Sequence, residues 1–418
     1  MPIGRPIQLL TATLVLGHVL VCGAQSVPQL PFSQHPPYAA GTIRPSHRSQ
    51  SQLDDDVRAY YDQWKPQFLV AAGTSPTGAP LYRVSFGSAN PGETVSEGQG
   101  YGMIIAAIMA GYDPEAQALF DGLWLFARQH PSTIDPSLMD FSVPGSEDGD
   151  DSAFDGDADM AYALLLAERQ WGNGGAINYR AEFDRTIAAI VASTIGVNSH
   201  LPLLGDWIDP ADKKTNEFTP RSSDFMIGHF RAFQRATGNA VWGQVVTASQ
   251  DVISSLQASR GRKTGLLPDF ITRKKNGTFR PVMGKLIETR LDGLYGYNAC
   301  RDPWRLGTDA VLNGDPVSLA QTQKMSAWVA GATGGNPQAI RAGYKLNGKP
   351  APNSKYFTIV FAAPFGVAAM TSPSQQEWLN AVYDAVATTH EDYYEDTVTL
   401  LSLLVMSGTF WDPTTIAP

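Results

Sequence analysis

DGDADMAYALLLAERQW, residues 155–171, is the stretch of this chain that most directly indicates its fold. Met160, Ala163, Leu164 and Ala167 recur at the i, i+3, i+4, i+7 spacing that places apolar side chains on one face of a helix. A glycine follows directly, where the C-terminal cap of a helix is expected. The stretch therefore predicts a helix that begins near its aspartates.

The same helical pattern continues outward from this stretch and fills the chain after Asp54. Strand-like alternation is scarce, and its best example is residues 81–84. No internal linker, close repeat or low-complexity tract interrupts the pattern, so about twelve helices predict one all-helical domain. The clearest predicted helices cover residues 55–70, 97–110, 114–129, 155–171, 178–195, 222–237, 240–259, 316–331, 375–388 and 392–407, with weaker segments near 304–312 and 355–370.

Composition excludes two classes of protein. The 418 residues include 31 Lys and Arg against 40 Asp and Glu, a formal net charge of −9, with 43% hydrophobic and 17% charged residues. An intrinsically disordered chain would have lower hydrophobicity and more charge. A nucleic-acid-binding domain would carry an excess of Lys and Arg, so we expect no nucleic-acid partner.

The N-terminus has the composition of a secretory signal peptide. One positive charge at Arg5 precedes an apolar run over residues 7–21, and small residues lead to Ala24. The apolar run is shorter than the ~20 residues that span a bilayer. We therefore expect cleavage near Ala24, secretion and no membrane anchoring.

Two further expectations follow for the mature chain. Residues 25–52 are rich in Pro, Gln, Ser and His, which is typical of an extended arm, and residues 53–418 remain as the single domain. Removal of residues 1–24 also removes Cys22 and leaves Cys300 as the only cysteine, so an intramolecular disulfide is excluded.

Glu97 stands in a glycine-rich patch, residues 95–103, at the start of an apolar helix. The glycines allow close approach of another group, but a dinucleotide site is excluded because no strand precedes them. Two interpretations remain open from the residues alone. Glu97 is either a catalytic carboxyl or a favourable charge at a helix N-terminus next to a Ser96 cap.

Alternating aspartates form a second patch, residues 150–161. A calcium loop counted from Asp155 would need glycine at position six and glutamate at position twelve, and these positions hold Met160 and Leu166. Asp155 alone would suffice to cap the helix. Because carboxylates crowded at one helix start repel each other, we expect a bound partner there, such as sugar hydroxyls or a cationic group.

Aromatic, carboxylate and arginine residues gather in two more patches, residues 286–305 and residues 204–207 with 221–225. Aromatic faces stack on sugar rings, and carboxylates and guanidinium groups bond hydroxyls, so these patches suit a carbohydrate-binding wall. The alternative is a surface network of arginines and carboxylates. The candidate substrate-binding residues are Tyr101, Trp124, Asp157, Asp206, Trp207, Asp224, Asp292, Tyr295, Asn298, Arg301 and Trp304.

Other chemistries lack their sequence motifs. No G-x-S-x-G motif of a serine hydrolase occurs. The seven histidines form no H-E-x-x-H motif or close pair, so we expect no metal site and no cofactor. Acid–base chemistry by carboxylates remains, which is the equipment of glycoside hydrolysis.

Residues 96–103, 155–171 and 298–305 resemble the glycoside hydrolases of family 8, and the likeness extends from about Leu53 to Asp412. This resemblance implies an (α/α)6 barrel of six helical hairpins and an inverting endo-hydrolase of β-1,4-linked glycans. It implies that Glu97 is the general acid and that Asp155 is the active-site aspartate that binds the central sugar.

The position of the base departs from the commonest family pattern. Many members carry a Tyr-Asp-Ala base motif, where this chain has asparagine at Asn298. The sequence instead resembles the subgroup whose base is a glutamate just upstream, which Glu288 matches, with Asp292 as the competing carboxylate.

Three functions stay open from the sequence. The first is an endo-β-1,4-glucanase acting on cellulose or mixed-linkage β-glucan. The second is a chitosanase with the same machinery, because the subgroup contains both activities. The third is an inactive glycan-binding protein that has lost its base. In each case we expect a secreted monomer with a polysaccharide partner.

Overall fold

The computed structural model describes residues 26–145 and 150–416. The predicted signal peptide, residues 1–24, lies outside these residues. Twelve α-helices occur in the described part of the chain, as the sequence predicts. They are α1 (Gln50–Phe68), α2 (Ser96–Ile108), α3 (Ala116–Gln129), α4 (Phe154–Trp171), α5 (Tyr179–Ser193), α6 (Ile227–Thr237), α7 (Val241–Ser259), α8 (Asp302–Asn313), α9 (Pro316–Thr333), α10 (Ile359–Ala369), α11 (Gln376–Val386) and α12 (Tyr393–Met406).

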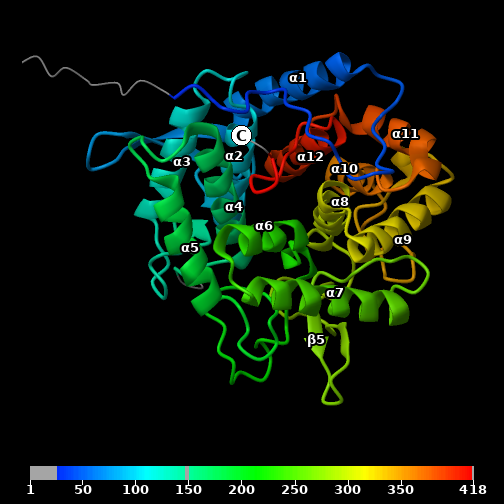
Figure 1. The fold of residues 1–418 in the computed structure, drawn as a ribbon. Coiled ribbons are helices and arrows are strands. Elements are labelled where there is room, and N and C mark those ends of the chain that lie inside the picture. The colour runs from blue at the N-terminus through cyan, green and yellow to red at the C-terminus, as the bar shows by residue number, and fades with distance from the viewer. Residues whose placement is uncertain (1–25, 146–149, 417–418) are drawn as a thin grey trace, which may run out of the picture.

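The helices form two concentric rings (Figure 1). The even-numbered helices contact one another in sequence order, and α12 closes the inner ring against α2. Each odd-numbered helix packs outside an inner neighbour: α3 on α2, α5 on α4, α7 on α6, α9 on α8, α11 on α10 and α1 on α12. This is an (α/α)6 barrel, and the predicted fold class is confirmed.

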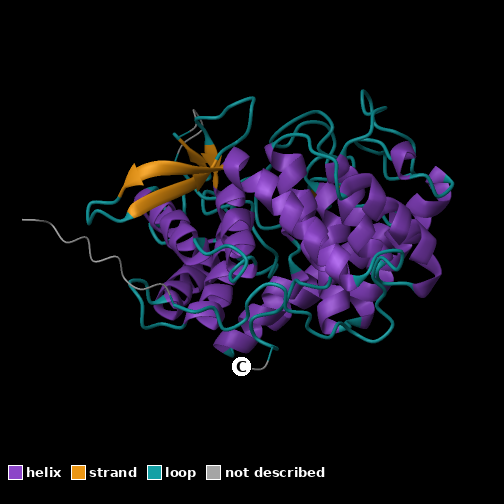
Figure 2. Ribbon diagram, turned by 90° about the horizontal axis from the view of Figure 1, so that it is seen from above, coloured by secondary structure: helices purple, strands orange, loops and turns teal. Residues whose placement is uncertain are grey.

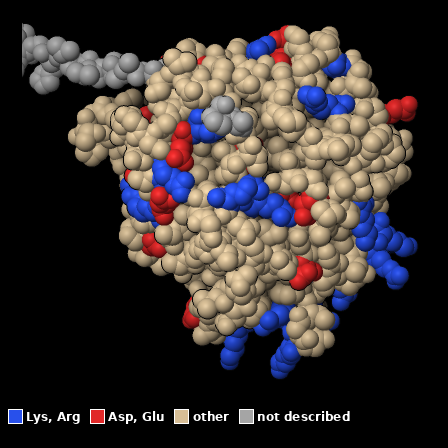
Figure 3. Space-filling model, viewed as in Figure 1, with Lys and Arg blue, Asp and Glu red and all other residues tan. Residues whose placement is uncertain are grey.

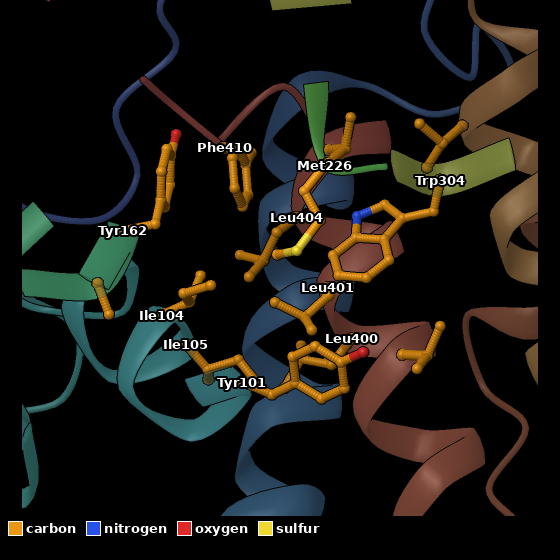
Figure 4. Close-up of a cluster of buried hydrophobic side chains, with 14 of the residues drawn as sticks. Tyr101, Ile104, Ile105, Tyr162, Met226, Trp304, Leu400, Leu401, Leu404 and Phe410 are labelled. Carbon is orange, nitrogen blue, oxygen red and sulfur yellow. The ribbon is translucent and has the colours of Figure 1, made fainter. Parts of the chain in front are cut away.

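The inner ring is apolar because it is covered on nearly every side. All of α10 and almost all of α4 and α12 are buried, whereas the outer helices bury one face and expose the other. Figure 4 shows side chains of α2 and α12 meeting in the middle of the barrel, together with Met226 and Trp304. The inner helices therefore form a rigid frame, and polar residues can be placed at the ends of these helices.

Two glycines let α2 and α4 approach closely. A Cβ atom on Gly100 would lie 2.6 Å from the Cβ of Asp159, and one on Gly156 would lie 2.5 Å from the backbone of Ser96. Such distances are far below van der Waals contact, so only glycine fits at either position. The glycine-rich pattern near Glu97 thus serves helix packing.

Sheet structure is confined to three short antiparallel pairs in the described residues. Figure 2 shows how small the share of strand is beside that of helix. They are β1 (Leu69–Thr74) with β2 (Pro80–Val84), β3 (Thr94–Val95) with β4 (Ser142–Val143), and β5 (Ile271–Arg273) with β6 (Phe279–Pro281). The strand predicted at residues 81–84 lies within β2. The β5–β6 pair is a hairpin that projects from the barrel in Figure 1.

Residues 26–49 run along the barrel without helix or strand. Their backbone N–H groups donate to backbone carbonyls at four separate places in the barrel, including Phe32 N to Ala110 O at 2.7 Å and Ile43 N to Met370 O at 2.9 Å. The Tyr38 hydroxyl donates to Phe410 O at 3.0 Å. These bonds fasten the segment to helices far apart in the sequence.

Two predicted boundaries are wrong. The first helix, predicted from residue 55, begins at Gln50, because Ser49 and Gln52 form a reciprocal capping box. The helix predicted from residue 222 begins at Ile227, because Ser222 and Asp224 bond side chains of the site instead and form a single 3₁₀ turn. No helix among the described residues is long and apolar enough to cross a membrane.

Candidate active site

The site lies where several inner helices begin. Glu97 and Asp155 are the second residues of α2 and α4, Asp224 lies just before α6, and Arg301 lies just before α8. The first turns of α2 and α4 have no side-chain cap, and the Ser96 hydroxyl has no partner among the described residues. The capping alternative for Ser96 is therefore wrong. The uncapped N–H groups direct positive partial charge toward the carboxylates.

Arg301 joins these helix ends. Its guanidinium is fully buried, and Nη1 donates to Glu97 Oε2, to Asp155 Oδ2 at 2.8 Å and to the Tyr101 hydroxyl at 3.1 Å. Nη2 donates to Ser223 Oγ at 2.8 Å and to Asn298 Oδ1 at 3.1 Å. One arginine thus orients the ends of α2 and α4 and the turn before α8.

Glu97 combines a desolvated carboxyl with access to solvent. Its side chain is 17% exposed. Burial raises the pKa of Glu97 to about 7, the Arg301 guanidinium opposes this rise, and the charge of Asp155 adds to it. Glu97 therefore holds a proton near neutral pH and can donate it.

Asp155 is ionised where Glu97 is protonated, although Asp155 is almost wholly buried. Burial alone would raise its pKa, but the guanidinium groups of Arg221 and Arg301 outweigh burial and hold the pKa of Asp155 well below its ordinary value. Arg221 Nη2 lies 3.0 Å from Asp155 Oδ1. Two neighbouring carboxyls in one site are thus kept in different protonation states, which is typical of acid–base enzymes.

Glu288 faces this group from a separate loop, residues 282–292, and its side chain is exposed. Asn298 Nδ2 donates to both Glu288 oxygens at 2.9 Å, while Asn298 Oδ1 accepts from Arg301. Glu97 and Glu288 are therefore linked through a guanidinium and an amide and do not contact each other directly. Asn298, predicted to bind substrate, contacts Glu288 and Arg301 in this structure.

Asp292 is enclosed by its own loop. Its Oδ2 accepts the backbone N–H groups of residues 286, 287 and 288 at 2.8–3.2 Å, and its Oδ1 accepts Thr289 N at 2.6 Å and Thr289 Oγ1 at 3.2 Å. Only 1% of the residue is exposed and both of its oxygens bond its own loop, so the substrate contact of Asp292 stays a prediction that this structure does not support. Its carboxylate shapes the turn that carries Glu288.

The remaining predicted acids also form hydrogen bonds or ion pairs within the protein. Asp224 is buried against Arg221 at 3.0 Å, and burial raises its pKa to about 7. Asp157 accepts Met139 N at 2.9 Å within the core. Asp206 accepts Ser132 Oγ at 2.6 Å and Ser152 N at 2.9 Å, which ties two loops together. Asp224 and Asp206 thus bond protein groups, whereas Asp157 Oδ2 is buried without a partner among the described residues, and the sugar contacts of the three carboxylates stay predictions.

Four predicted aromatic residues lie in the core and not at a sugar-binding surface. Tyr101 packs edge-on against Trp304 with ring centroids 5.8 Å apart (Figure 4), and Trp124 and Tyr295 are equally buried. Trp207 is partly exposed and packs against the small cluster around Leu286.

Two exposed tyrosines were missing from the predicted site. Tyr297 and Tyr356 are 40% and 49% exposed, and their hydroxyl groups are 2.9 Å apart. Tyr297 precedes Asn298, so the pair borders the Glu288 side of the site. Because the two tyrosines are 59 residues apart in the sequence, no local pattern predicts that they form a pair. Arg221 was also missed as a site residue, although its patch was recognised.

A protonated buried carboxyl and a separate exposed carboxylate, held on a helical barrel, define an acid–base hydrolase of glycosidic bonds. The described residues contain no group of three or more His, Cys, Asp and Glu side chains able to hold a metal ion.

The chain matches glycosyl hydrolases family 8 over residues 49–408. It is 43% identical over 392 residues to a beta-glucanase of Niallia circulans, covering 93% of each chain. It is 37% identical over 391 residues to an endoglucanase of Bacillus sp. (strain KSM-330), covering 92% of this chain and 82% of the relative. The chain belongs to glycosyl hydrolases family 8 and is a glycoside hydrolase.

Solved structures show the same relationship. A beta-1,3-1,4-glucanase from Paenibacillus sp. X4 has a TM-score of 0.87 and 42% identity, covering 92% of this chain and all of that one. A cold-adapted family 8 xylanase, at 19% identity, has a TM-score of 0.72 and covers 92% of this chain and 98% of its own. The xylanase shares the fold.

Proposed function

We propose that the protein is an endo-acting, inverting β-glucanase that cleaves β-1,4-glucosidic bonds in cellulose or mixed-linkage β-glucan. The arrangement of Glu97 and Glu288 across Arg301 and Asn298 carries this proposal. The beta-glucanase and endoglucanase names of relatives at 43% and 37% identity support the choice of a glucan. The chain therefore acts on a polysaccharide.

Each carboxyl has one task in the proposed reaction. Glu97 donates its proton to the glycosidic oxygen as the bond from that oxygen to the anomeric carbon breaks. Glu288 takes a proton from a water molecule whose oxygen attacks the anomeric carbon from the opposite side. Asp155 stays ionised beside two guanidinium groups, and its charge helps to keep the proton on Glu97. Both of its oxygens are bonded by arginines in this structure, so its contact with the central sugar stays a prediction.

The substrate test compares neutral and cationic polymers. We expect reducing sugar to be released faster from mixed-linkage β-glucan than from highly deacetylated chitosan near pH 6. Exposed tyrosines suit the neutral sugars of a glucan, whereas Asp206, Asp224 and Asp292, which could hold ammonium groups, are hydrogen-bonded within the protein. Faster chitosan hydrolysis would identify a chitosanase, and no release from any polymer would identify a binding protein.

The stereochemical course tests the role of Glu288. A base that activates water is separated from the acid by roughly 6.5–9.5 Å, and the product is inverted, whereas a nucleophile lies at about 5 Å and gives retention. We expect proton NMR of fresh product to show the α-anomer first, with the β-anomer appearing by mutarotation. An initial β-anomer contradicts the inverting mechanism.

The pH dependence tests the state of Glu97. Its pKa of about 7 means that the proton needed for catalysis is present below pH 7 and is lost above it. We expect kcat/KM to fall about tenfold per pH unit above pH ~7, because this parameter reports groups of the free enzyme. A profile that stays flat to pH 9 would contradict the assignment.

We also propose that the chain is secreted as a monomer after removal of residues 1–24. The signal-like composition of these residues supports secretion. N-terminal sequencing of protein recovered from culture medium should begin near Gln25, and its mass in solution should be that of one chain.

A further inference from the structure

Unpaired cations concentrate in one part of this acidic protein. Residues 260–290 hold nine Lys and Arg residues and only two carboxylates, Asp269 and Glu288. None of the nine forms an ion pair with a described carboxylate, whereas arginines such as Arg221, Arg301 and Arg305 do. Figure 3 shows Lys and Arg side chains projecting at the edge that carries the β5–β6 hairpin in Figure 1. The region is therefore strongly positive against an overall charge of −9.

Two of these cations flank the proposed base. Lys285 and Arg290 lie three residues before and two residues after Glu288, and both are exposed. Their loop is folded tightly around the Asp292 carboxylate, which accepts four consecutive backbone N–H groups. Both positive side chains therefore extend from the same tight turn as Glu288.

A second pair lies on the other side of the exposed tyrosines. Lys345 and Lys355 line a surface hollow of about 690 Å³ together with Tyr356, and no Asp or Glu lines it. The Tyr356 hydroxyl is bonded to that of Tyr297, the residue before Asn298. Both lysines are exposed, and neither pairs with a described carboxylate. The hollow is thus a cationic extension of the Glu288 side.

We propose that Lys285, Arg290, Lys345 and Lys355, here called the cationic border, bind carboxylate groups carried by the glucan chain. The preferred substrate class is then a β-glucan with anionic substituents, and polycations are repelled. This inference rests on the proposed glucanase function. Exposed charges contribute modestly one by one, but charges of one sign at a site raise the local concentration of an oppositely charged polymer.

The test measures the ratio of kcat/KM on carboxymethylcellulose to kcat/KM on neutral hydroxyethylcellulose. At ~10 mM ionic strength we expect Lys285→Ser/Arg290→Ser and Lys345→Ser/Lys355→Ser each to lower this ratio roughly three- to tenfold. Salt at ~0.3 M should lower the wild-type ratio and leave the variants little changed, because screening shortens the reach of these charges. Circular dichroism verifies that the variants fold. We expect them to do so, because these exposed side chains form no ion pairs that stabilise the fold.

Lys274→Ser/Lys275→Ser is the matched control. It removes the same charge from the exposed turn of the β5–β6 hairpin, and we expect it to keep the wild-type ratio. An unchanged ratio in both border variants, or an equal fall in the control, overturns the proposal. If the unmodified enzyme does not hydrolyse hydroxyethylcellulose, the proposed glucanase function itself is refuted. Failure of the cationic-border proposal and failure of the glucanase function are therefore distinguishable.

Discussion

Glu97→Gln lowers kcat on mixed-linkage β-glucan by at least ~10³-fold, which is the expected result if Glu97 is the general acid. Glutamine has the shape of the protonated acid and can accept from Arg301, but it has no proton to give to the leaving oxygen. The barrel core does not involve this side chain, so the helical circular dichroism should persist.

Two comparisons separate this role from a structural one. A β-cellobioside with a dinitrophenolate leaving group needs little protonation, so Glu97→Gln should lose far less activity on it than on glucan. Glu115→Gln, an exposed carboxylate paired with Lys65 at the start of α3, should behave as wild type. Near-normal turnover of glucan by Glu97→Gln would remove this residue from the role.

Glu288→Ala should abolish measurable turnover, because the neighbouring carboxylates Asp155 and Asp292 are buried and already hydrogen-bonded within the protein. Azide, which needs no base, should restore cleavage and form an α-glycosyl azide while Glu97 protonates the leaving oxygen. Detection of this product by mass spectrometry and NMR is the measurement. Its formation would also support inversion.

Asp292→Asn is the matched variant in the same loop. An amide in place of the carboxylate directs an NH₂ group at backbone N–H donors, so the turn should distort and kcat should fall partly. Azide should not restore this variant, because Glu288 remains present. An inactive Asp292→Asn beside an active Glu288→Ala would make Asp292 the base.

Helix positions were predictable because they depend on neighbours in sequence. The apolar spacing of residues 160–167 predicted α4, and the same spacing located the other helices within a few residues. The start of α6 was missed because Ser222 bonds Asp302, eighty residues away. Local helix propensity is overridden where the side chain forms a buried hydrogen bond with a residue far away in the sequence.

Periodicity and motifs are local properties of the chain, so the twelve helices, the family and the polar patches that carry the site could be predicted from the sequence. Which of the polar residues are accessible in the site depends on how the chain folds. Arg301 reaches Glu97 across 204 positions, and the turn around Asp292 consumes that carboxylate while Glu288 stays exposed. Burial and hydrogen-bond partners set the pKa and the accessibility of a carboxyl, and both arise when distant segments pack together.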